Sequence, residues 1–177
     1  MMTDEATSGR PIVILVMGVA GSGKTTVGRL LAEALDAAYE EGDAYHSPEN
    51  VAKMRDGTPL TDADRWPWLE RLATLIDDWL GQDRRTVLSC SALKQSYRDV
   101  LIGDRRGIAL VYLSGTEALI RQRLGTRRGH YMPADLLASQ FEALEEPDDA
   151  ITLDVRPKPQ CIANLAAARL AENLSNE

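Results

Sequence analysis

A glycine-rich segment that ends in lysine and threonine carries the clearest chemistry in the sequence. Residues 18–25 read GVAGSGKT and match the pattern G-x-x-x-x-G-K-S/T. Glycines let the backbone curl so that successive N–H groups point inward at phosphate oxygens, and a helix starting there adds positive potential. Lys24 is expected to reach the terminal phosphates, and the Thr25 hydroxyl to coordinate Mg²⁺. The motif therefore predicts a nucleoside triphosphate site, with an accidental glycine turn as the alternative.

The residues expected to bind the nucleotide form one continuous run, which we call the cradle. They are Gly18, Val19, Ala20, Gly21, Ser22, Gly23, Lys24, Thr25 and Thr26. Lys24 is also assigned a catalytic role, because its charge offsets the negative charge on the transferred phosphoryl group.

The cradle lies between segments that are typical of a buried strand and a helix. Residues 11–17 are almost all apolar, and residues 24–36 carry apolar side chains at helical spacing. Further strands are expected at residues 38–41, 86–90, 108–113 and 151–155. Further helices are expected at residues 48–55, 67–81, 93–101, 117–127, 134–145 and 162–174. Strands that alternate with helices form a mostly parallel sheet covered on both faces, so we expect one three-layer α/β domain over residues 1–177, with residues 1–10 as a flexible N-terminus.

Composition narrows the partners and the compartment. The 177 residues carry a formal charge of -7, which disfavours binding to nucleic acid or to anionic membranes. The longest apolar run, residues 12–20, is shorter than the roughly 20 residues of a membrane span, and acidic residues precede it. Cys90 and Cys161 are expected to be reduced core residues, with a disulfide as the alternative. We therefore expect a cytoplasmic protein with no nucleic-acid or membrane partner.

Motifs that are missing from the sequence exclude other nucleotide-binding classes. No Asn-Lys-x-Asp string occurs, so a guanine-nucleotide switch is disfavoured. The expected strand at residues 86–90 ends in serine and cysteine rather than in the acidic residues of a motor ATPase. A small phosphotransferase, with a second substrate opposite the cradle, fits the sequence best.

Five segments downstream of the cradle resemble bacterial gluconate kinases (gluconokinases). They are residues 41–54 (EGDAYHSPENVAKM), 57–68 (GTPLTDADRWPW), 90–94 with 97–99 (CSALK, YRD), 127–133 (RRGHYMP) and 139–142 (SQFE). The resemblance spans residues 12–155. It implies a P-loop kinase fold with strand order 2-3-1-4-5, a mobile lid at about residues 125–133, and a homodimer. The activity it implies is Mg²⁺-dependent transfer of the ATP γ-phosphoryl group to the 6-hydroxyl of D-gluconate.

Two acidic residues lie at and just after the end of the second expected strand, at the sheet edge where α/β proteins bind ligands. Phosphoryl transfer needs an acceptor hydroxyl in line with the γ-phosphorus and a group that takes its proton. Asp43 is assigned this role by position and by the resemblance, with a turn-capping loop carboxylate as the alternative. Glu41 is a candidate for holding a Mg²⁺-bound water, and a solvated carboxylate at the end of the strand is equally compatible.

Five further residues are candidates for binding gluconate. Arg65 is suited to gripping the carboxylate bidentately, and pairing with Asp62 or Asp64 is its alternative. Arg98 is a second candidate donor. His46 lies three residues after Asp43, where it is either a pocket residue or structural. The remaining candidates are Lys53, whose alternative is a solvated helix lysine, and Gln140, which rests on the resemblance.

An arginine cluster at residues 121–128 is unusual in an acidic chain and indicates a polyanion partner. Arg123 and Arg127 lie four residues apart, on one face of the expected helix. We expect Arg123 to flank the adenine and Arg127 to close on the phosphates as a catalytic residue, with His130 of the same lid assigned to the substrate. A solvated basic helix end is the alternative.

Two other functions remain compatible with these residues. One is a related kinase for another sugar acid or polyol, similar to shikimate kinase. The other is an ATP-binding regulatory module without turnover, which needs the cradle but has no use for Asp43 or the lid arginines.

Overall fold

A computed structural model describes residues 10–126 and 134–173 of the chain. The described elements in chain order are β1 (Val13–Met17), α1 (Lys24–Ala34), β2 (Ala38–Glu41), a 3₁₀ turn (Gly42–Tyr45), α2 (Pro48–Arg55), α3 (Asp62–Gly81), β3 (Thr86–Ser89), α4 (Gln95–Leu101), β4 (Ile108–Ser114), α5 (Glu117–Thr126), α6 (Ala134–Ala143), β5 (Ile151–Asp154) and α7 (Pro159–Asn173). Among these residues no helix is both long and apolar enough to cross a membrane.

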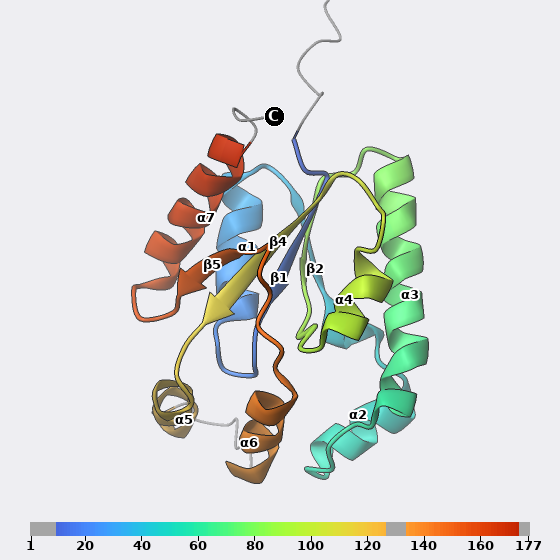
Figure 1. Ribbon diagram of the computed structural model, residues 1–177, viewed down its shortest axis with the longest axis vertical. Coiled ribbons are helices and arrows are strands. Elements are labelled where there is room, and N and C mark those ends of the chain that lie inside the picture. Colours follow the sequence, from blue (N-terminus) through green and yellow to red (C-terminus); the bar gives the residue numbers. More distant parts are fainter. Residues whose placement is uncertain (1–9, 127–133, 174–177) are drawn as a thin grey trace, which may run out of the picture.

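The five strands form one parallel sheet with the order β2-β3-β1-β4-β5, as expected. β1 lies at the centre, where Val13 pairs with Thr86 of β3 and with Ile108 of β4. Helices α1 and α7 cover one face of the sheet, and α3 and α4 cover the other (Figure 1). This confirms the three-layer α/β fold class.

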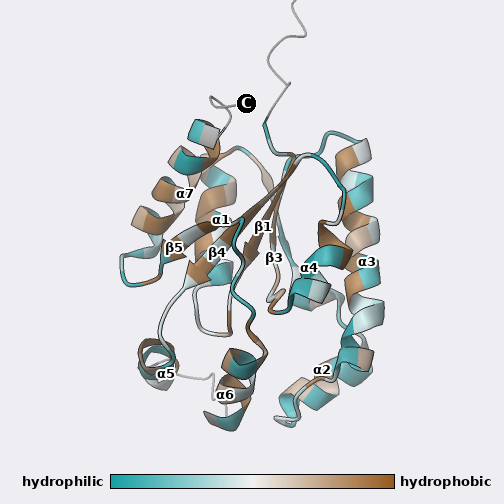
Figure 2. Cartoon of the chain, viewed as in Figure 1, coloured by the Kyte–Doolittle hydropathy of each residue, from teal (hydrophilic) through white to brown (hydrophobic). Residues whose placement is uncertain are grey.

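Burial on both faces explains the continuous apolar run of β1. Ile14 and Val16 pack into the core beneath α1 and α7, whereas Val13, Leu15 and Met17 pack into the core beneath α3 and α4. Successive side chains of a strand point to opposite faces of the sheet. Because both faces are covered here, apolar and polar side chains cannot alternate along the strand. Figure 2 shows the result, with the most apolar segments in the central strands.

Two helices begin earlier than the sequence indicated. α3 begins at Asp62 rather than at residue 67, because the Thr61 side chain and the Asp64 side chain form a capping box. Pro67 therefore lies inside the helix. α7 begins at Pro159 rather than at residue 162.

The two cysteines differ in their environment. Both are free, which agrees with the expectation of reduced thiols. Cys90 is buried after β3, but Cys161 is exposed, so its assignment to the core was wrong. The buried face of α7 is formed instead by Ile162, Ala163, Ala166 and Leu170.

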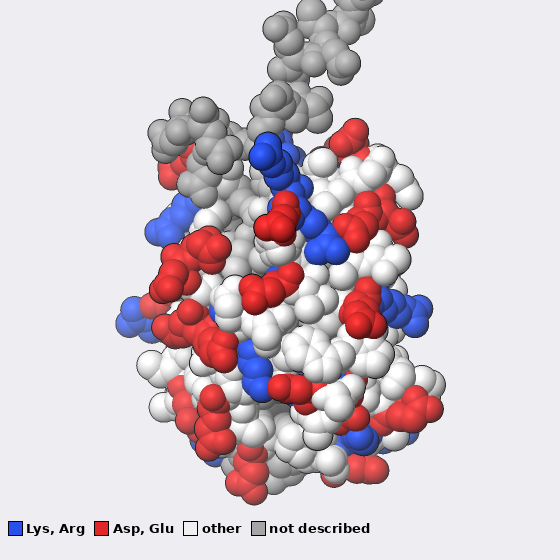
Figure 3. Space-filling view, turned by 45° about the vertical axis from the view of Figure 1, so that its right-hand side comes forward, with Lys and Arg blue, Asp and Glu red and all other residues white. Residues whose placement is uncertain are grey.

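All strands of a parallel sheet point the same way, so the segments that follow β1, β2 and β3 meet at one edge. This edge faces α2, α5 and α6 in the lower part of Figure 1. Figure 3 shows acidic side chains spread over one face of the molecule with basic ones interspersed, as the net charge of -7 leads one to expect. An anionic ligand must therefore be bound by local donors at this edge.

Candidate active site

A cavity of about 310 Å³ opens at the carboxyl edge of the sheet. The cradle contributes Ala20, Gly21, Gly23, Lys24, Thr25 and Thr26 to its lining. Glu41, Asp43 and His46 line it from the segment after β2. Arg65 and Trp68 line it from α3, and Gln140 from α6. Residues from four separate parts of the sequence thus surround one space.

The cradle backbone requires its glycines. Gly21 and Gly23 have φ angles of 79° and 99°, in the left-handed region that favours glycine. A Cβ atom on Gly21 would also lie only 2.8 Å from the Leu124 side chain. The turn therefore specifies glycine both by backbone conformation and by close packing.

Lys24 lies folded into the cradle at the start of α1. Its Nζ donates a hydrogen bond to the carbonyl of Val19 at 3.0 Å. Burial lowers the pKa of Lys24, while the nearby carboxylates of Asp43 and Glu41 act in the opposite direction. The ammonium group is thus held in a partly desolvated space, where a bound phosphate would restore its charge compensation.

Thr25 and Glu41 form a pair that suits Mg²⁺. The Thr25 hydroxyl donates to Oε2 of Glu41 at 2.8 Å, which leaves the lone pairs of Oγ1 for a cation. The described residues contain no group of three or more His, Cys, Asp or Glu side chains that could cage a metal. Mg²⁺ bound mainly by phosphate oxygens, water and one hydroxyl needs no such cage, so these residues fit the ion.

Asp43 lies in the 3₁₀ turn after β2 and presents its carboxylate to the cavity. Nε2 of His46 lies 3.9 Å from Oδ1 of Asp43. The His46 ring stacks on Trp68 with ring centroids 4.1 Å apart, and the Trp68 indole donates to the carbonyl of Gly42 at 2.8 Å. Trp68 therefore fixes both the turn that carries Asp43 and the imidazole beside it.

Burial lowers the pKa of His46, and Asp43 only partly opposes this effect. The imidazole is therefore neutral at pH 7. Its Nδ1 lies 3.4 Å from the side-chain amide nitrogen of Asn50, which places the ring proton on Nε2, toward Asp43.

Arg65 lines the cavity without a carboxylate partner among the residues that the structure describes. Its guanidinium donates to the carbonyl of Leu60 and lies 5.8 Å from the Tyr97 ring centroid. The alternative pairing with Asp62 or Asp64 is not observed. Asp62 instead accepts from Lys94, at 2.9 Å, and from Tyr97, while Asp64 accepts from Lys53 at 2.7 Å.

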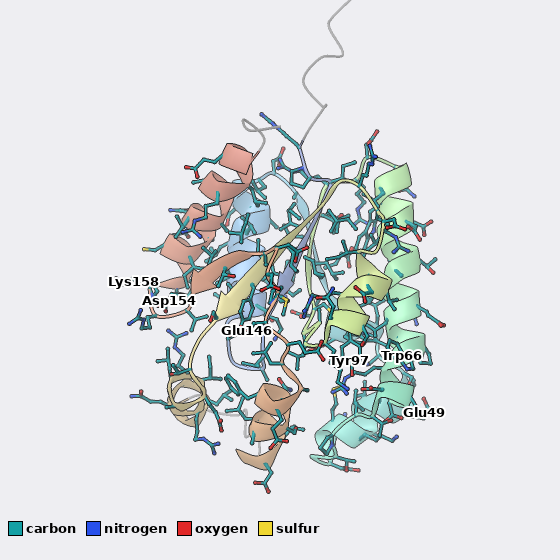
Figure 4. All side chains as sticks on the ribbon, in the orientation of Figure 1. Glu49, Trp66, Tyr97, Glu146, Asp154 and Lys158 are labelled. Carbon is teal, nitrogen blue, oxygen red and sulfur yellow. The ribbon has the colours of Figure 1, made fainter. Side chains whose placement is uncertain are left out.

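An aromatic pair supports Arg65 from behind. Trp66 and Tyr97 meet edge to face with their ring centroids 5.5 Å apart, where α3 lies beside α4 (Figure 4). Lys94 also lies 5.6 Å from the centre of the Tyr97 ring. Trp66 and Trp68 thus serve mainly as packing anchors.

Two predicted substrate residues lie elsewhere. Arg98 is 2% exposed and donates to the carbonyls of Ala92 and Leu93, at 3.0 and 3.1 Å. It secures the loop after β3, in which Ala92 has a φ of 44°, so the structure does not bring it to the substrate site. The Lys53 ammonium pairs with Asp64 and does not line the cavity, so the structure does not bring it to the substrate site.

Gln140 and Arg123 both make defined contacts, but in different places. Oε1 of Gln140 accepts from the backbone N–H of Ala20 at 2.7 Å, which connects α6 to the cradle. Arg123 donates to the carbonyl of Val155, just after β5, and lies outside the cavity lining. The predicted residues Arg127 and His130, and most of the predicted lid, lie outside the described residues.

Tyr39 supports the site from outside the cavity lining and was missed from the sequence. The Tyr39 hydroxyl lies 2.6 Å from Oε2 of Glu41 and 3.0 Å from Oγ of Ser89. Burial, followed by the hydrogen bond to Glu41, raises the pKa of Tyr39 to about 12, so the hydroxyl keeps its proton. Its spacing of two residues from Glu41 was the available signal, since such residues share one face of a strand.

The sheet order, the cradle at the end of the central strand and the cavity beside it define a P-loop kinase fold. The family model described as an AAA domain matches residues 13–147. A shikimate kinase from Acinetobacter baumannii in complex with shikimate shares this fold, with a TM-score of 0.53 at 22% identity over 95% of both chains.

Closer relatives narrow the class. A gluconokinase of Gluconobacter oxydans (strain 621H) is 49% identical over 144 residues, which cover 79% of each chain. The thermoresistant gluconokinase of Escherichia coli (strain K12) is 37% identical over 147 residues, covering 81% of this chain and 84% of that one. The crystal structure of a gluconokinase from Sinorhizobium meliloti 1021 matches with a TM-score of 0.84 and 44% identity, over 94% of this chain and 95% of that one. The chain belongs to the gluconokinase family.

Proposed function

We propose that the protein transfers the γ-phosphoryl group of ATP to the 6-hydroxyl of D-gluconate, giving 6-phospho-D-gluconate and ADP. The observation that carries the proposal is the shared cavity. The phosphate-binding residues Lys24 and Thr25 and the acceptor-side residues Asp43 and Arg65 line the same space of about 310 Å³. Family membership supports gluconate as the acceptor.

On the nucleotide side, the N–H groups of the cradle and the Lys24 ammonium bind the phosphates. Thr25 and Glu41 would hold Mg²⁺, which when bound neutralises charge on the phosphate oxygens. Arg123 flanks the adenine in this proposal, and Arg127 closes over the phosphates. The roles of Arg123, Arg127 and His130 rest on the resemblance to gluconate kinases.

On the acceptor side, Asp43 orients the 6-hydroxyl toward the γ-phosphorus and takes its proton as the new bond forms. Neutral His46 turns its single N–H, on Nε2, toward the side of the cavity where Asp43 lies, and donates it to a substrate hydroxyl. Arg65 binds the carboxylate of gluconate, and Gln140 binds a hydroxyl beside the cradle.

A coupled ADP-release assay with a panel of acceptors tests the proposal. D-gluconate should give the highest kcat/KM, ahead of other aldonates, polyols and shikimate, because the guanidinium and the hydroxyl contacts must be satisfied together. A higher kcat/KM for another sugar acid would reassign the acceptor. The absence of turnover with every acceptor, together with tight ATP binding, would favour a regulatory module.

The proposal includes two features of the whole protein. The homodimer rests on the resemblance and is checked by light scattering coupled to size-exclusion chromatography. The cytoplasmic location rests on composition and is checked by cell fractionation.

A further inference from the structure

The Tyr39 side chain lies behind the Thr25–Glu41 pair, at the point where β2, β3 and α1 meet. Its hydroxyl lies 2.6 Å from Oε2 of Glu41 in the same strand, β2. Its oxygen also lies 3.0 Å from Oγ of Ser89 in β3, and that Oγ lies 3.1 Å from the carbonyl oxygen of Lys24 in α1, so the single Ser89 proton can be donated to either of these two oxygens. Tyr39 thus connects the Glu41 carboxylate with the first residue of the helix that follows the cradle.

The fold leaves a fitted space for the Tyr39 ring. A Cβ atom on Gly28 of α1 would lie 2.8 Å from Cε2 of Tyr39 and 2.7 Å from Oγ of Ser89. Arg29 lies on the same helix as Gly28, and its guanidinium carbon is 5.2 Å from the centroid of the Tyr39 ring. Only a residue without a side chain at position 28 allows the ring to reach under α1, so the Tyr39 hydroxyl is held in place by packing.

Oε2 of Glu41 receives two hydrogen bonds from opposite sides. Tyr39 contacts it at 2.6 Å from the strand, and Thr25 donates to it at 2.8 Å from the cradle. Hydrogen bonds to a charged acceptor are short and directional, so the carboxylate is fixed before any ligand arrives. Without Tyr39, the Glu41 side chain would keep only the Thr25 contact, and its rotamers would be less restricted.

We propose that Tyr39 is a positioning residue that holds Glu41 against Thr25 and so preorganises the magnesium site of the nucleotide complex. The inference rests on the proposed function, because it concerns the metal used with ATP. Tyr39 does not line the cavity, so it acts through Glu41 rather than on the substrates.

Tyr39→Phe tests the inference, with Tyr45→Phe as the matched control. Phenylalanine keeps the ring in the space beside Gly28 and removes only the hydroxyl. The Tyr45 hydroxyl donates to Oε2 of Glu40 at 2.8 Å, so its removal deletes the same kind of bond from the neighbouring carboxylate, away from the cradle. Thermal unfolding of both variants verifies that they are folded.

The readout is ADP affinity, measured by calorimetry with Mg²⁺ and again with EDTA. The ratio of the ADP affinity with Mg²⁺ to the ADP affinity with EDTA gives the tightening of ADP binding that the metal supplies. Binding of Mg²⁺ to free ADP is the same for every variant, so it does not affect the comparison of these ratios. We expect Tyr39→Phe to reduce this tightening about three- to tenfold, the effect of losing one hydrogen bond to a charged group. Its ADP affinity in EDTA and its KM for gluconate should stay within about twofold of the wild type, a range well below one such bond. Tyr45→Phe should match the wild type throughout.

Three results would count against the account, and they are distinguishable. Full metal-dependent tightening in Tyr39→Phe overturns the inference alone. An equal loss of ADP affinity with Mg²⁺ and with EDTA overturns it too, because that pattern reflects general damage to the cradle. If the wild type itself shows no metal-dependent tightening, the metal site of the proposed function fails, and the inference fails with it.

Discussion

At the scale of single residues, the site places an ammonium group and a carboxylate around one cavity. Lys24 is buried and its pKa is lowered mainly by desolvation, while Asp43 and Glu41 oppose that shift. Asp43 keeps a side chain that is 60% exposed, as an acceptor substrate would require. The two residues therefore differ in role. Lys24 is held by the fold where it can contact a phosphate, and Asp43 remains accessible to the hydroxyl of the acceptor substrate.

Asp43→Asn separates chemistry from nucleotide binding. The amide keeps the shape but cannot take a proton, so we expect kcat to fall by about 10²- to 10⁴-fold. ADP affinity measured by calorimetry should remain close to that of the wild type. The exposed residue Asp56, at the end of α2, provides the control Asp56→Asn, which should leave kcat unchanged. Wild-type turnover in Asp43→Asn would remove Asp43 from the mechanism.

Arg65→Lys tests carboxylate recognition. Lysine keeps the charge but loses the planar, two-pronged donor geometry, so the KM for gluconate should rise about tenfold, while the KM for ATP changes little. Arg71→Lys on the same helix, where Arg71 lies over the Tyr45 ring, is the control. Equal increases in both KM values for Arg65→Lys would refute a role in binding the acid.

At the scale of elements, the start of α3 controls where Arg65 and Trp68 lie. Thr61 and Asp64 cap the helix reciprocally, and Asp64 also accepts from Lys53 at 2.7 Å. The same short segment thus fixes α3 and ties it to α2. The acceptor side of the cavity depends on this arrangement.

Thr61→Ala should lower the free energy of unfolding by about 1 kcal/mol, because one N-terminal N–H group of α3 loses its acceptor. Denaturant unfolding measures the change. The matched variant Thr74→Ala removes a hydroxyl that donates to the carbonyl of Glu70 within the same helix, and it should cost less. Equal losses for the two variants would contradict the capping role.

Acid should selectively weaken this cap. The hydrogen bonds from Lys53 and Thr61 lower the pKa of Asp64 to about 2, below its ordinary value of 3.8. Its stabilising contribution is therefore complete above pH 3.8 and is lost as the pH falls toward 2. The stability difference between wild type and Asp64→Asn, measured by denaturant unfolding across this range, should shrink on acidification. A difference independent of pH would contradict the assignment.

The strands could be predicted from the sequence because buried apolar runs are local signals, whereas the strand order was implied by the resemblance to gluconate kinases. β2 and α2 were predicted with their observed bounds. The start of α3 was missed because Pro67 was taken as a first-turn residue, although the capping box at Thr61 was already present in the sequence. The T-x-x-D spacing of Thr61 and Asp64 would have placed the start of α3 correctly.

Residues of the site could be predicted where their position along the chain places them at the cavity. They were harder to predict where their location depends on side-chain contacts with distant parts of the chain. Six of the nine cradle residues line the cavity, together with Asp43, His46, Arg65 and Gln140. Arg98 lies outside the cavity lining, because its guanidinium donates to loop carbonyls, a contact that the sequence of a helix does not indicate. Tyr39 was missed because its partner Ser89 lies 50 residues away and comes close only in the sheet.

At the scale of the whole molecule, an acidic protein with a net charge of -7 gathers the donors for two anionic substrates at one edge of its sheet. The parallel order makes this possible, because it brings the ends of β1, β2 and β3 together. Two cores, one on each face, hold β1 rigid beneath the cradle. The fold thus supplies the fixed geometry that in-line transfer needs.

Phosphorus NMR of the product formed from ATP and D-gluconate tests the central claim most directly. If the cavity aims the terminal hydroxyl at the γ-phosphorus, the new phosphate ester should show coupling to the two methylene protons of C6. A signal coupled to a single proton would place the phosphoryl group on a secondary hydroxyl. That result, or ADP formation without a new ester, would contradict the arrangement of Asp43, Arg65 and the cradle described above.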